Sequence, residues 1–251
     1  MKERIRINSD AIELRRRFGE DAGSPVDIFA LLGAIKDLTV VFCPMSDNIS
    51  GMTVKDEGIR LIAINSRLSK GRQRFTAAHE LCHLYFHTEF RTIVCAKDIA
   101  GTRTDLEKEA DLFASFFLAP YESLHHFIQV DMDRATSKLT MDDVIRIEQY
   151  FGMSHQATLV RLQADKFITA SESQALEKNV ISTARRLGYT TDLYLPTPEG
   201  SQYMTTGSYL RLADELYTKG AVSSGKYEEW LLDAYRSDIV YGDNASEEDY
   251  D

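Results

Sequence analysis

Two histidines four residues apart, with a glutamate beside the first, are the residues of this chain best suited to chemistry. They lie in the segment His79-Glu80-Leu81-Cys82-His83, within an apolar run compatible with a helix. Residues four apart share one face of a helix, so His79 and His83 can direct two imidazole nitrogens at one metal ion. Glu80 would then stand where a general base can activate a water molecule at that metal. The spacing therefore predicts metal-assisted peptide hydrolysis.

A third metal ligand is needed, because a catalytic zinc usually takes three protein ligands and keeps one position for water. The acidic segment 107–111 provides the candidates. Glu107 and Asp111 share a helix face, so Glu107 could bind the metal while Asp111 accepts a hydrogen bond from a ligating histidine. Glu109 points about 200° around the helix from Glu107, so only one of the two can face the metal. Glu107 also fits a capping box that begins at Thr104. The spacing alone does not decide whether Glu107 or Glu109 is the third metal ligand.

The elements that must position these residues predict an α+β fold. Helices are expected at 9–20 and after Pro25, and strands at 38–43, 49–54 and 58–65, with a hairpin turn at 56–58. A helix over 69–87 carries the histidines, a loop covers 88–102, and a helix over 104–118 carries the acidic segment. We expect helices around a small three-stranded, mainly antiparallel sheet, with a mainly helical C-terminal part.

The later half of the chain predicts further units. We expect a zinc metallopeptidase domain over 1–135, a helix-turn-helix-like module over 136–170 packed on it, a mainly helical region over 171–241, and a disordered acidic tail over 242–251. Helices are expected at 142–150, 155–167, 171–187, 209–217 and 226–235, with a connector or small hairpin over 188–207. The module's second helix offers Arg161 and Lys166 but also Asp165. This low basic density favours packing or protein docking over DNA binding.

Composition excludes several classes of protein. The formal net charge of −10 argues against a general binder of DNA or of membrane surfaces. No segment reaches the roughly 18 apolar residues that span a bilayer. The first residues are charged and predict no signal peptide. The cysteines, Cys43, Cys82 and Cys95, are widely spaced, which is typical of reduced thiols in a cytoplasmic protein.

Several blocks of the sequence resemble the ImmA/IrrE family of zinc metallopeptidases. The resemblance rests on the segments 74–83, with His87 four residues on, 107–114 and 117–120, and is extended upstream by 25–28 and 64–65. It covers roughly residues 25 to 165. The chain departs from the family pattern at Cys82, where the family generally has glycine, and a side chain there could crowd the neighbouring strand.

The resemblance implies a small α+β zinc peptidase that cleaves helix-turn-helix repressors. His79, His83 and an acidic residue would hold one zinc ion, with Glu80 as the base. We prefer Glu107 over Glu109 as the third ligand, because its four-residue spacing to Asp111 resembles that of related zinc peptidases. Manganese or cobalt could take similar ligands.

The remaining histidine and cysteine side chains have simpler interpretations. We expect His87 to be a packed or substrate-side residue and Cys82 to be a small buried residue. Cys43 and Cys95 are expected to be structural.

Three functions follow from these observations. The first is a zinc metalloendopeptidase that cleaves a repressor and relieves repression. The second is a regulator that sequesters a repressor or toxin on the same scaffold without cutting it. The third, and least favoured, is a DNA-binding regulator that uses the 136–170 module. The substrate-binding residues are not identified by the sequence.

Overall fold

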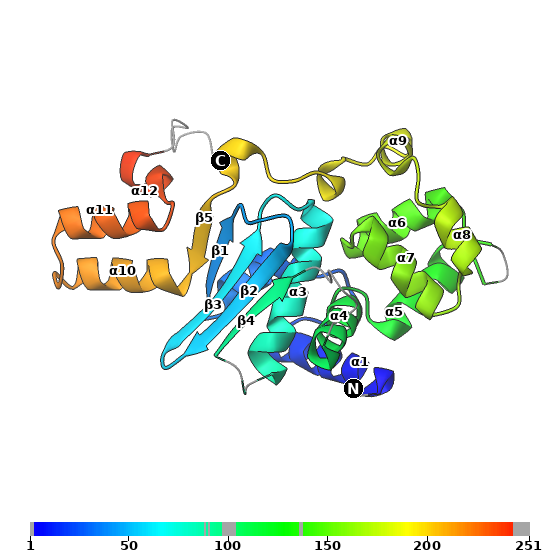
Figure 1. Cartoon of the computed structure of the whole chain (residues 1–251), viewed down its shortest axis with the longest axis horizontal. Helices are drawn as coiled ribbons and strands as arrows, with labels where there is room; N and C mark the ends of the chain where they lie inside the picture. The colour runs from blue at the N-terminus through cyan, green and yellow to red at the C-terminus, as the bar shows by residue number, and fades with distance from the viewer. Residues whose placement is uncertain (1–2, 88, 90, 97–103, 136–137, 243–251) are drawn as a thin grey trace.

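A central β-sheet with one long helix across it organises the molecule (Figure 1). The computed structural model describes residues 3–87, 89, 91–96, 104–135 and 138–242. Helix α3 packs on strands β2 and β3, α4 packs on α3, and α1 packs on α4. The helices and strands are, in chain order, α1 (Arg4–Arg17), α2 (Ile28–Ala34), β1 (Thr39–Cys43), β2 (Ile49–Asp56), β3 (Ile59–Asn65), α3 (Lys70–Phe86), β4 (Thr92–Ala96), α4 (Asp105–Leu118), α5 (Tyr121–His126), α6 (Met141–Phe151), α7 (His155–Ala164), α8 (Ala170–Ala175), α9 (Val180–Arg186), β5 (Met204–Gly207), α10 (Ser208–Thr218), α11 (Ser224–Asp233) and α12 (Ser237–Tyr241).

The sheet has five strands in the order β4-β2-β3-β1-β5, not the three that were expected. Strand β4 lies inside the segment 88–102, which was predicted to be a loop, and β5 lies inside the predicted connector 188–207. Both strands are short, and β5 pairs antiparallel with β1, which lies far away in the sequence. Pairing over such a separation leaves no local pattern to detect. The expected α+β class is confirmed, and β1 and β3 run parallel in an otherwise antiparallel sheet.

The expected hairpin between β2 and β3 is confirmed. Asp56 pairs with Ile59, which leaves Glu57 and Gly58 as a two-residue turn. Gly58 has a φ of 76°, a left-handed conformation that glycine adopts without steric cost. The turn sets the register that brings the buried residues of β2 onto the face covered by α3.

One continuous hydrophobic core runs from α1 to the residues just after α7. It includes Val40, Ile62 and Ile64 of the sheet and the phenylalanines of α4. Val144, Ile147 and Phe151 of α6 and Leu159 and Leu162 of α7 belong to the same core. The two helices of the predicted helix-turn-helix-like module are therefore packed against the rest of the fold.

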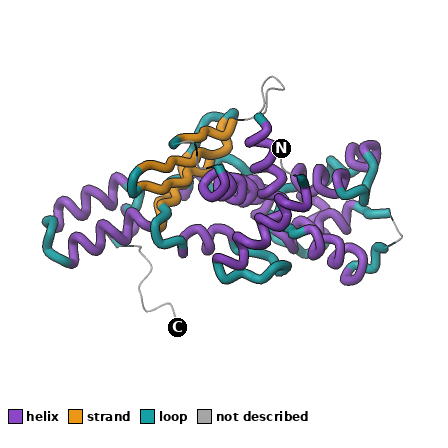
Figure 2. The backbone as a smooth tube through the Cα atoms, turned by 90° about the horizontal axis from the view of Figure 1, so that it is seen from below, coloured by secondary structure: helices purple, strands orange, loops and turns teal. Residues whose placement is uncertain are grey.

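The predicted single helix over 171–187 is wrong. Helices α8 and α9 are separate, and Asn179 between them has a φ of 66°, which breaks the helical backbone. Helices α10 and α11 form a hairpin that projects beyond β5, on the opposite side of the sheet from α6 to α9 (Figures 1 and 2). The predicted disordered tail lies outside the described residues, apart from Gly242.

Candidate metal centre

Helix α3 carries His79, Glu80 and His83, all buried, at the centre of the fold. The end of this helix is anchored by Lys55 of β2, whose ammonium group donates to the carbonyl oxygens of His83 and His87 at 2.9 and 2.5 Å. A cation at a helix C-terminus satisfies carbonyl groups that have no partner within the helix. The helix that carries the motif is thus held by the sheet beneath it.

Three potential ligands converge on one point. His79 Nε2 and His83 Nε2 are 3.0 Å apart. The Glu107 carboxylate of α4 places Oε2 at 3.3 Å from His79 Nε2 and Oε1 at 3.3 Å from His83 Nε2. Ligands of a tetrahedral zinc at about 2.0–2.1 Å from the metal stand about 3.3 Å from one another. The side chains therefore have the donor types and separations that fit a zinc ion.

Hydrogen bonds behind the histidines turn their Nε2 lone pairs towards this point. His79 Nδ1 lies 2.9 Å from Asp111 Oδ1, and a carboxylate can only accept there, so the His79 ring proton is on Nδ1. His83 Nδ1 lies 2.7 Å from His87 Nδ1, and His87 Nε2 lies 3.6 Å from Glu109 Oε1. With the His87 proton on Nε2, facing that carboxylate, Nδ1 of His87 accepts from His83. Both rings then present lone pairs to a metal.

The two candidate third ligands occupy different places. Glu107 lies between His79 and His83, whereas Glu109 lies at His87. Thr104 caps α4 by accepting a hydrogen bond from the Glu107 backbone N–H at 3.3 Å. One of the two hydrogen bonds of the predicted capping box is thus present, while the carboxylate of Glu107 is directed at the histidines.

One carboxylate oxygen of Glu80 is hydrogen-bonded and the other is not, among the residues described. Thr53 of β2 donates to Oε2 at 2.6 Å, and Oε1 is buried with no hydrogen-bond partner among the described residues. Gly51 makes room for this side chain, since a Cβ at that position would stand 2.7 Å from Glu80 Oε1 and 2.5 Å from Thr76 Cγ2. An orphaned buried oxygen beside two metal-type ligands marks a place where a polar group is missing.

Cys95 of β4 completes the group, although the sequence analysis assigned it only a structural role. Potential ligand atoms of His79, His83, Cys95 and Glu107 all lie within 4.8 Å of one another, and Cys95 Sγ is 3.9 Å from Glu107 Oε1. A β-bulge between Ile49 and Gly51 on β2 shifts the pairing opposite Cys95. Bulges of this kind re-aim side chains next to functional sites. The expectation that Cys82 is small and buried is confirmed, and it lies in the core.

The site is electrostatically polarised. Burial raises the pKa of Glu80, against the opposing effects of His79, Thr53 and Cys95. Burial would lower the pKa of His79, but its contacts with Asp111, Cys95 and Glu107 raise it instead. Burial also raises the pKa of the Cys95 thiol, to about 12. Burial acts in the same direction on Glu107, but hydrogen bonds from His79 and His83 outweigh it and lower the pKa of that carboxyl.

A cleft of about 690 Å³ opens from the four-residue group towards α7. Ala157, Val160 and Ala164 of α7 form an apolar wall, and the cationic side chains Arg4, Arg72 and Lys108 also line the cleft. The opening is large enough for several side chains of an extended peptide, and His79, Cys95 and Glu107 are among its lining residues.

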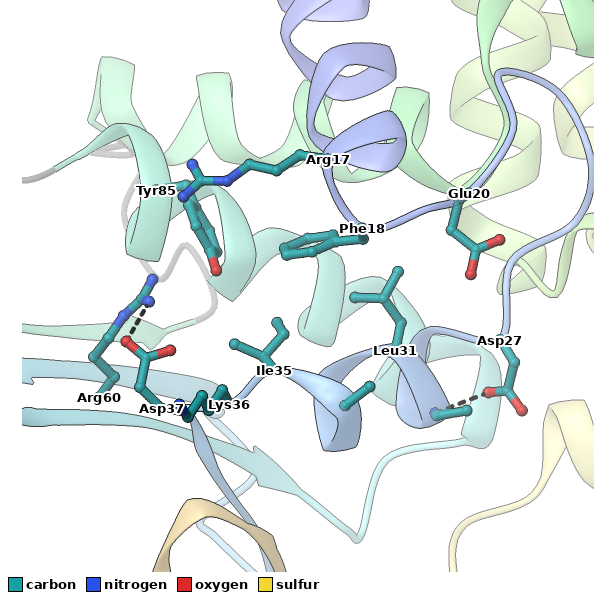
Figure 3. Close-up of a pocket in the computed structure, with 12 residues that line it drawn as sticks. Arg17, Phe18, Glu20, Asp27, Leu31, Ile35, Lys36, Asp37, Arg60 and Tyr85 are labelled. Carbon is teal, nitrogen blue, oxygen red and sulfur yellow. Dashed lines mark hydrogen bonds and ion pairs between the residues drawn. The ribbon is translucent and has the colours of Figure 1, made fainter.

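A second cavity of about 690 Å³ lies between the end of α1, α2 and Tyr85 (Figure 3). Three of its charged residues, Asp27, Asp37 and Arg60, are held by hydrogen bonds. Arg60 donates to Asp37 at 2.8 Å, and Asp27 accepts from the first N–H groups of α2. The Arg60 guanidinium lies over the Tyr85 ring, 4.7 Å from its centroid. We assign this cavity a structural role.

Of the two basic residues that the predicted second helix of the module offers, Lys166 is exposed but Arg161 is inside the protein. Arg161 of α7 is 2% exposed and donates to the carbonyl oxygens of Ser115 and Ala119 at 3.1 and 3.0 Å. Its Nε donates to Asp165 at 2.6 Å. This arginine therefore stabilises the end of α4 and is not presented to a nucleic acid.

Comparison with known proteins agrees with the geometry. A family model for the IrrE N-terminal-like domain, Peptidase_M78, matches residues 35–163, just over half of the chain. The chain belongs to this metallopeptidase family. The match includes α3, β4 and α4, and so contains every residue of the candidate metal centre.

Other comparisons are distant. A search among curated proteins found no match. A solved structure, a Mycobacterium tuberculosis transcriptional regulator, is similar at 14% identity with a TM-score of 0.42, over 62% of this chain and 46% of that one. The similarity thus spans less than half of that regulator's length, and it carries no argument about function. Within the described part of this M78-family chain, no helix has the length and apolar character to cross a membrane.

Proposed function

We propose that this chain is a zinc-dependent metalloendopeptidase that cleaves a helix-turn-helix transcriptional repressor and so relieves repression. One observation carries the proposal: two imidazole nitrogens and a carboxylate converge at separations of 3.0 to 3.3 Å, next to the base candidate Glu80. We propose one zinc ion per chain, held by His79, His83 and Glu107. The free state of all three cysteines suits a cytoplasmic enzyme.

Zinc bound there would supply Lewis acidity that polarises a peptide carbonyl and makes a water molecule more acidic. Glu80 takes the proton of the attacking water on its free Oε1 and passes it to the leaving amine. Thr53 holds the other oxygen and so fixes the direction of the free one. Burial raises the pKa of Glu80, which makes it a stronger base than an exposed carboxylate and a usable acid in the second half of the reaction.

Asp111 and His87 act by orienting ligands. Each accepts a hydrogen bond from the Nδ1–H of one histidine, which keeps the proton on Nδ1 and leaves the Nε2 lone pair free for a metal. The cleft along α7 would admit an extended peptide with apolar side chains on one side and acidic groups near Arg4, Arg72 and Lys108. The choice of a repressor as substrate rests on the family resemblance.

The test replaces Glu80 by Gln and measures zinc content and proteolysis together. We expect Glu80→Gln to bind zinc as wild type does and to cleave an internally quenched, mixed-sequence peptide library at least about 100-fold more slowly, because the proton acceptor is lost. Retained cleavage would overturn the role of Glu80. A zinc-loaded wild-type protein that cuts neither the library nor any co-expressed helix-turn-helix repressor would support the sequestration alternative.

A further inference from the structure

Catalytic and structural zinc sites differ in their fourth ligand. A catalytic site has three protein ligands and an open position, whereas a structural site is closed by a fourth side chain. In this protein, three side chains that could form a catalytic site and a fourth that could close it lie around one point. His79, His83 and Glu107 make a three-ligand set, and Cys95 Sγ lies within 4.8 Å of one potential ligand atom of each of them.

We propose that Cys95 is a fourth zinc ligand that closes the site in a resting state and excludes the catalytic water. This inference rests on the zinc site of the proposed function. It makes the chain a peptidase whose activity depends on whether a thiolate or a water molecule occupies the fourth position.

The geometry needs only a small movement. A thiolate bound at about 2.3 Å from zinc stands about 3.6 Å from a nitrogen or oxygen ligand at about 2.0–2.1 Å. Cys95 Sγ is already 3.9 Å from Glu107 Oε1, and no separation in the group exceeds 4.8 Å. These separations exceed those of a zinc-bound thiolate by about 1 Å at most.

The fold directs this thiol at the site by two independent features. Cys95 pairs with Gly51, whose missing side chain leaves space towards Glu80 on the α3 side of the sheet. The bulge at Ser50 sets the local direction of β4, and Ser50 Oγ donates to the Cys95 carbonyl oxygen at 3.1 Å. Cys95 is 2% exposed, so its sulfur faces the interior group and not bulk water.

A separate observation points to the same missing partner. Glu80 Oε1 is buried without a hydrogen-bond partner among the residues described, although Oε2 of the same carboxylate is bonded to Thr53. Ligation forms the zinc–sulfur bond, displaces the water molecule and releases the thiol proton, which Glu80 accepts on Oε1. In this Cys95-ligated state the catalytic water is absent and Glu80 is protonated. Dissociation of Cys95 from zinc would restore the water and the unprotonated Glu80 together.

Cobalt provides the test, because a thiolate ligand gives Co²⁺ a sulfur-to-metal charge-transfer absorption in the near ultraviolet that nitrogen and oxygen ligands do not give. We expect the full-length protein, loaded with Co²⁺ alone, to show this absorption. Cys95→Ser should abolish it, while Cys43→Ser and Cys82→Ala, which remove the other two thiols, should retain it. Absence of this absorption in the cobalt-loaded wild-type protein would overturn the inference without recourse to any variant.

Zinc affinity and hydrolysis provide a second readout. Cys95→Ser should bind zinc at least about tenfold more weakly, since a ligand is lost. The same variant, saturated with zinc, should cleave the mixed-sequence peptide library several-fold faster than wild type. Cobalt binding without the sulfur absorption, or a saturated Cys95→Ser protein that cleaves more slowly, would overturn the inference and leave the proposed function standing. Failure to bind any metal would overturn both.

Discussion

At the scale of single residues, the candidate metal centre includes groups that lie behind the proposed ligands. The His83 ring is oriented by His87, which in turn faces Glu109. Such outer hydrogen bonds fix the protonation pattern of a ligating imidazole and contribute to metal affinity. The two glutamates on α4 lie beside different histidines, although they are only two residues apart.

This difference in position predicts the zinc content of two matched variants. Glu107→Gln removes a negatively charged ligand and should leave the purified protein with little zinc. Glu109→Gln keeps the size and polarity of the group behind His87 and should retain close to one zinc per chain. Inductively coupled plasma mass spectrometry on both, beside wild type, decides the matter. The reverse pattern would identify Glu109 as the ligand.

A second residue-scale prediction concerns His87 itself. His87→Ala removes the acceptor for His83 Nδ1 and should weaken zinc binding by about 10–100-fold. His87→Asn places an amide oxygen near the former Nδ1 and should recover most of that loss. Competition with a chromophoric chelator measures both, with the exposed His126→Ala as control. Equal affinity in all three variants would show that His87 only fills space.

The residues of the motif could be predicted from sequence because their spacing on two helices has a direct geometric meaning. Glu107 could not be separated from Glu109 on that basis alone, because helix spacing does not reveal which face meets α3. Cys95 was missed for a different reason. It lies on a short edge strand, and its direction depends on a bulge in β2 and on the absence of a side chain at Gly51.

At the scale of elements, the caps of the helices are well encoded. The helix predicted at 142–150 is α6, and Thr140 before it forms a capping box with Asp143. Asp143 Oδ2 accepts from the Thr140 backbone N–H at 2.9 Å and from Arg134 Nε at 3.1 Å. Helix starts of this kind are local, so sequence predicts them, whereas the edge strands β4 and β5 depend on distant partners.

The cap leads to a prediction with a defined pH dependence. Asp143→Asn should lower the free energy of unfolding by about 1 kcal/mol at neutral pH, because the charged cap and its pairing with Arg134 are lost. Burial raises the pKa of Asp143, but the hydrogen bonds from Thr140 and Arg134 outweigh burial and lower this pKa below 3.8 in the folded protein. A carboxyl whose pKa is lower in the folded than in the unfolded protein stabilises the fold at any pH above its unfolded-state pKa. This stabilisation is lost as the pH falls through the folded-state pKa.

The measurement is urea unfolding of wild type and Asp143→Asn between neutral pH and about pH 2. The difference between the two proteins should be constant at neutral pH and should shrink below pH 3.8, the ordinary value for an aspartate. A difference that stays constant throughout would mean that the charge of Asp143 contributes nothing to the cap.

At the scale of the whole molecule, two buried arginines from different segments hold the end of α4. Arg15 of α1 donates to the Phe117 carbonyl oxygen at 2.6 Å, and Arg161 of α7 donates to those of Ser115 and Ala119. Because α4 also carries Glu107, the position of that carboxylate depends on helices at both ends of the core. We therefore expect the module predicted at 136–170 to fold together with α3 and α4.

This dependence predicts the behaviour of two truncated chains. A chain ending at residue 135 lacks Arg161 and the apolar residues of α6 and α7 that belong to the common core. It should fail to fold, because the carbonyl groups at the end of α4 lose their donor and the apolar faces of α4 and α5 lose their cover. A chain ending at residue 203 lacks only β5 and the helices after it, which contribute nothing to that core cluster, and should fold and retain zinc.

Far-ultraviolet circular dichroism with thermal melting, together with zinc content, compares the two truncated chains with the full-length protein. A cooperative melt and bound zinc in the chain ending at 135 would show that the peptidase is independent of α6 and α7, as the boundary at residue 135 first suggested. If instead the chain ending at 203 alone melts cooperatively, α10 to α12 are an appendage joined through β5. Besides β5, the removed segment holds the rest of the fold through Arg211, which donates to the carbonyl oxygens of Gly33, Ile35 and Lys36. Because no described residue of the removed segment lines the cleft at the candidate metal centre, the same chain should match full-length protein in cleavage of the mixed-sequence library. A loss of cleavage with zinc retained would assign α10 to α12 to substrate binding.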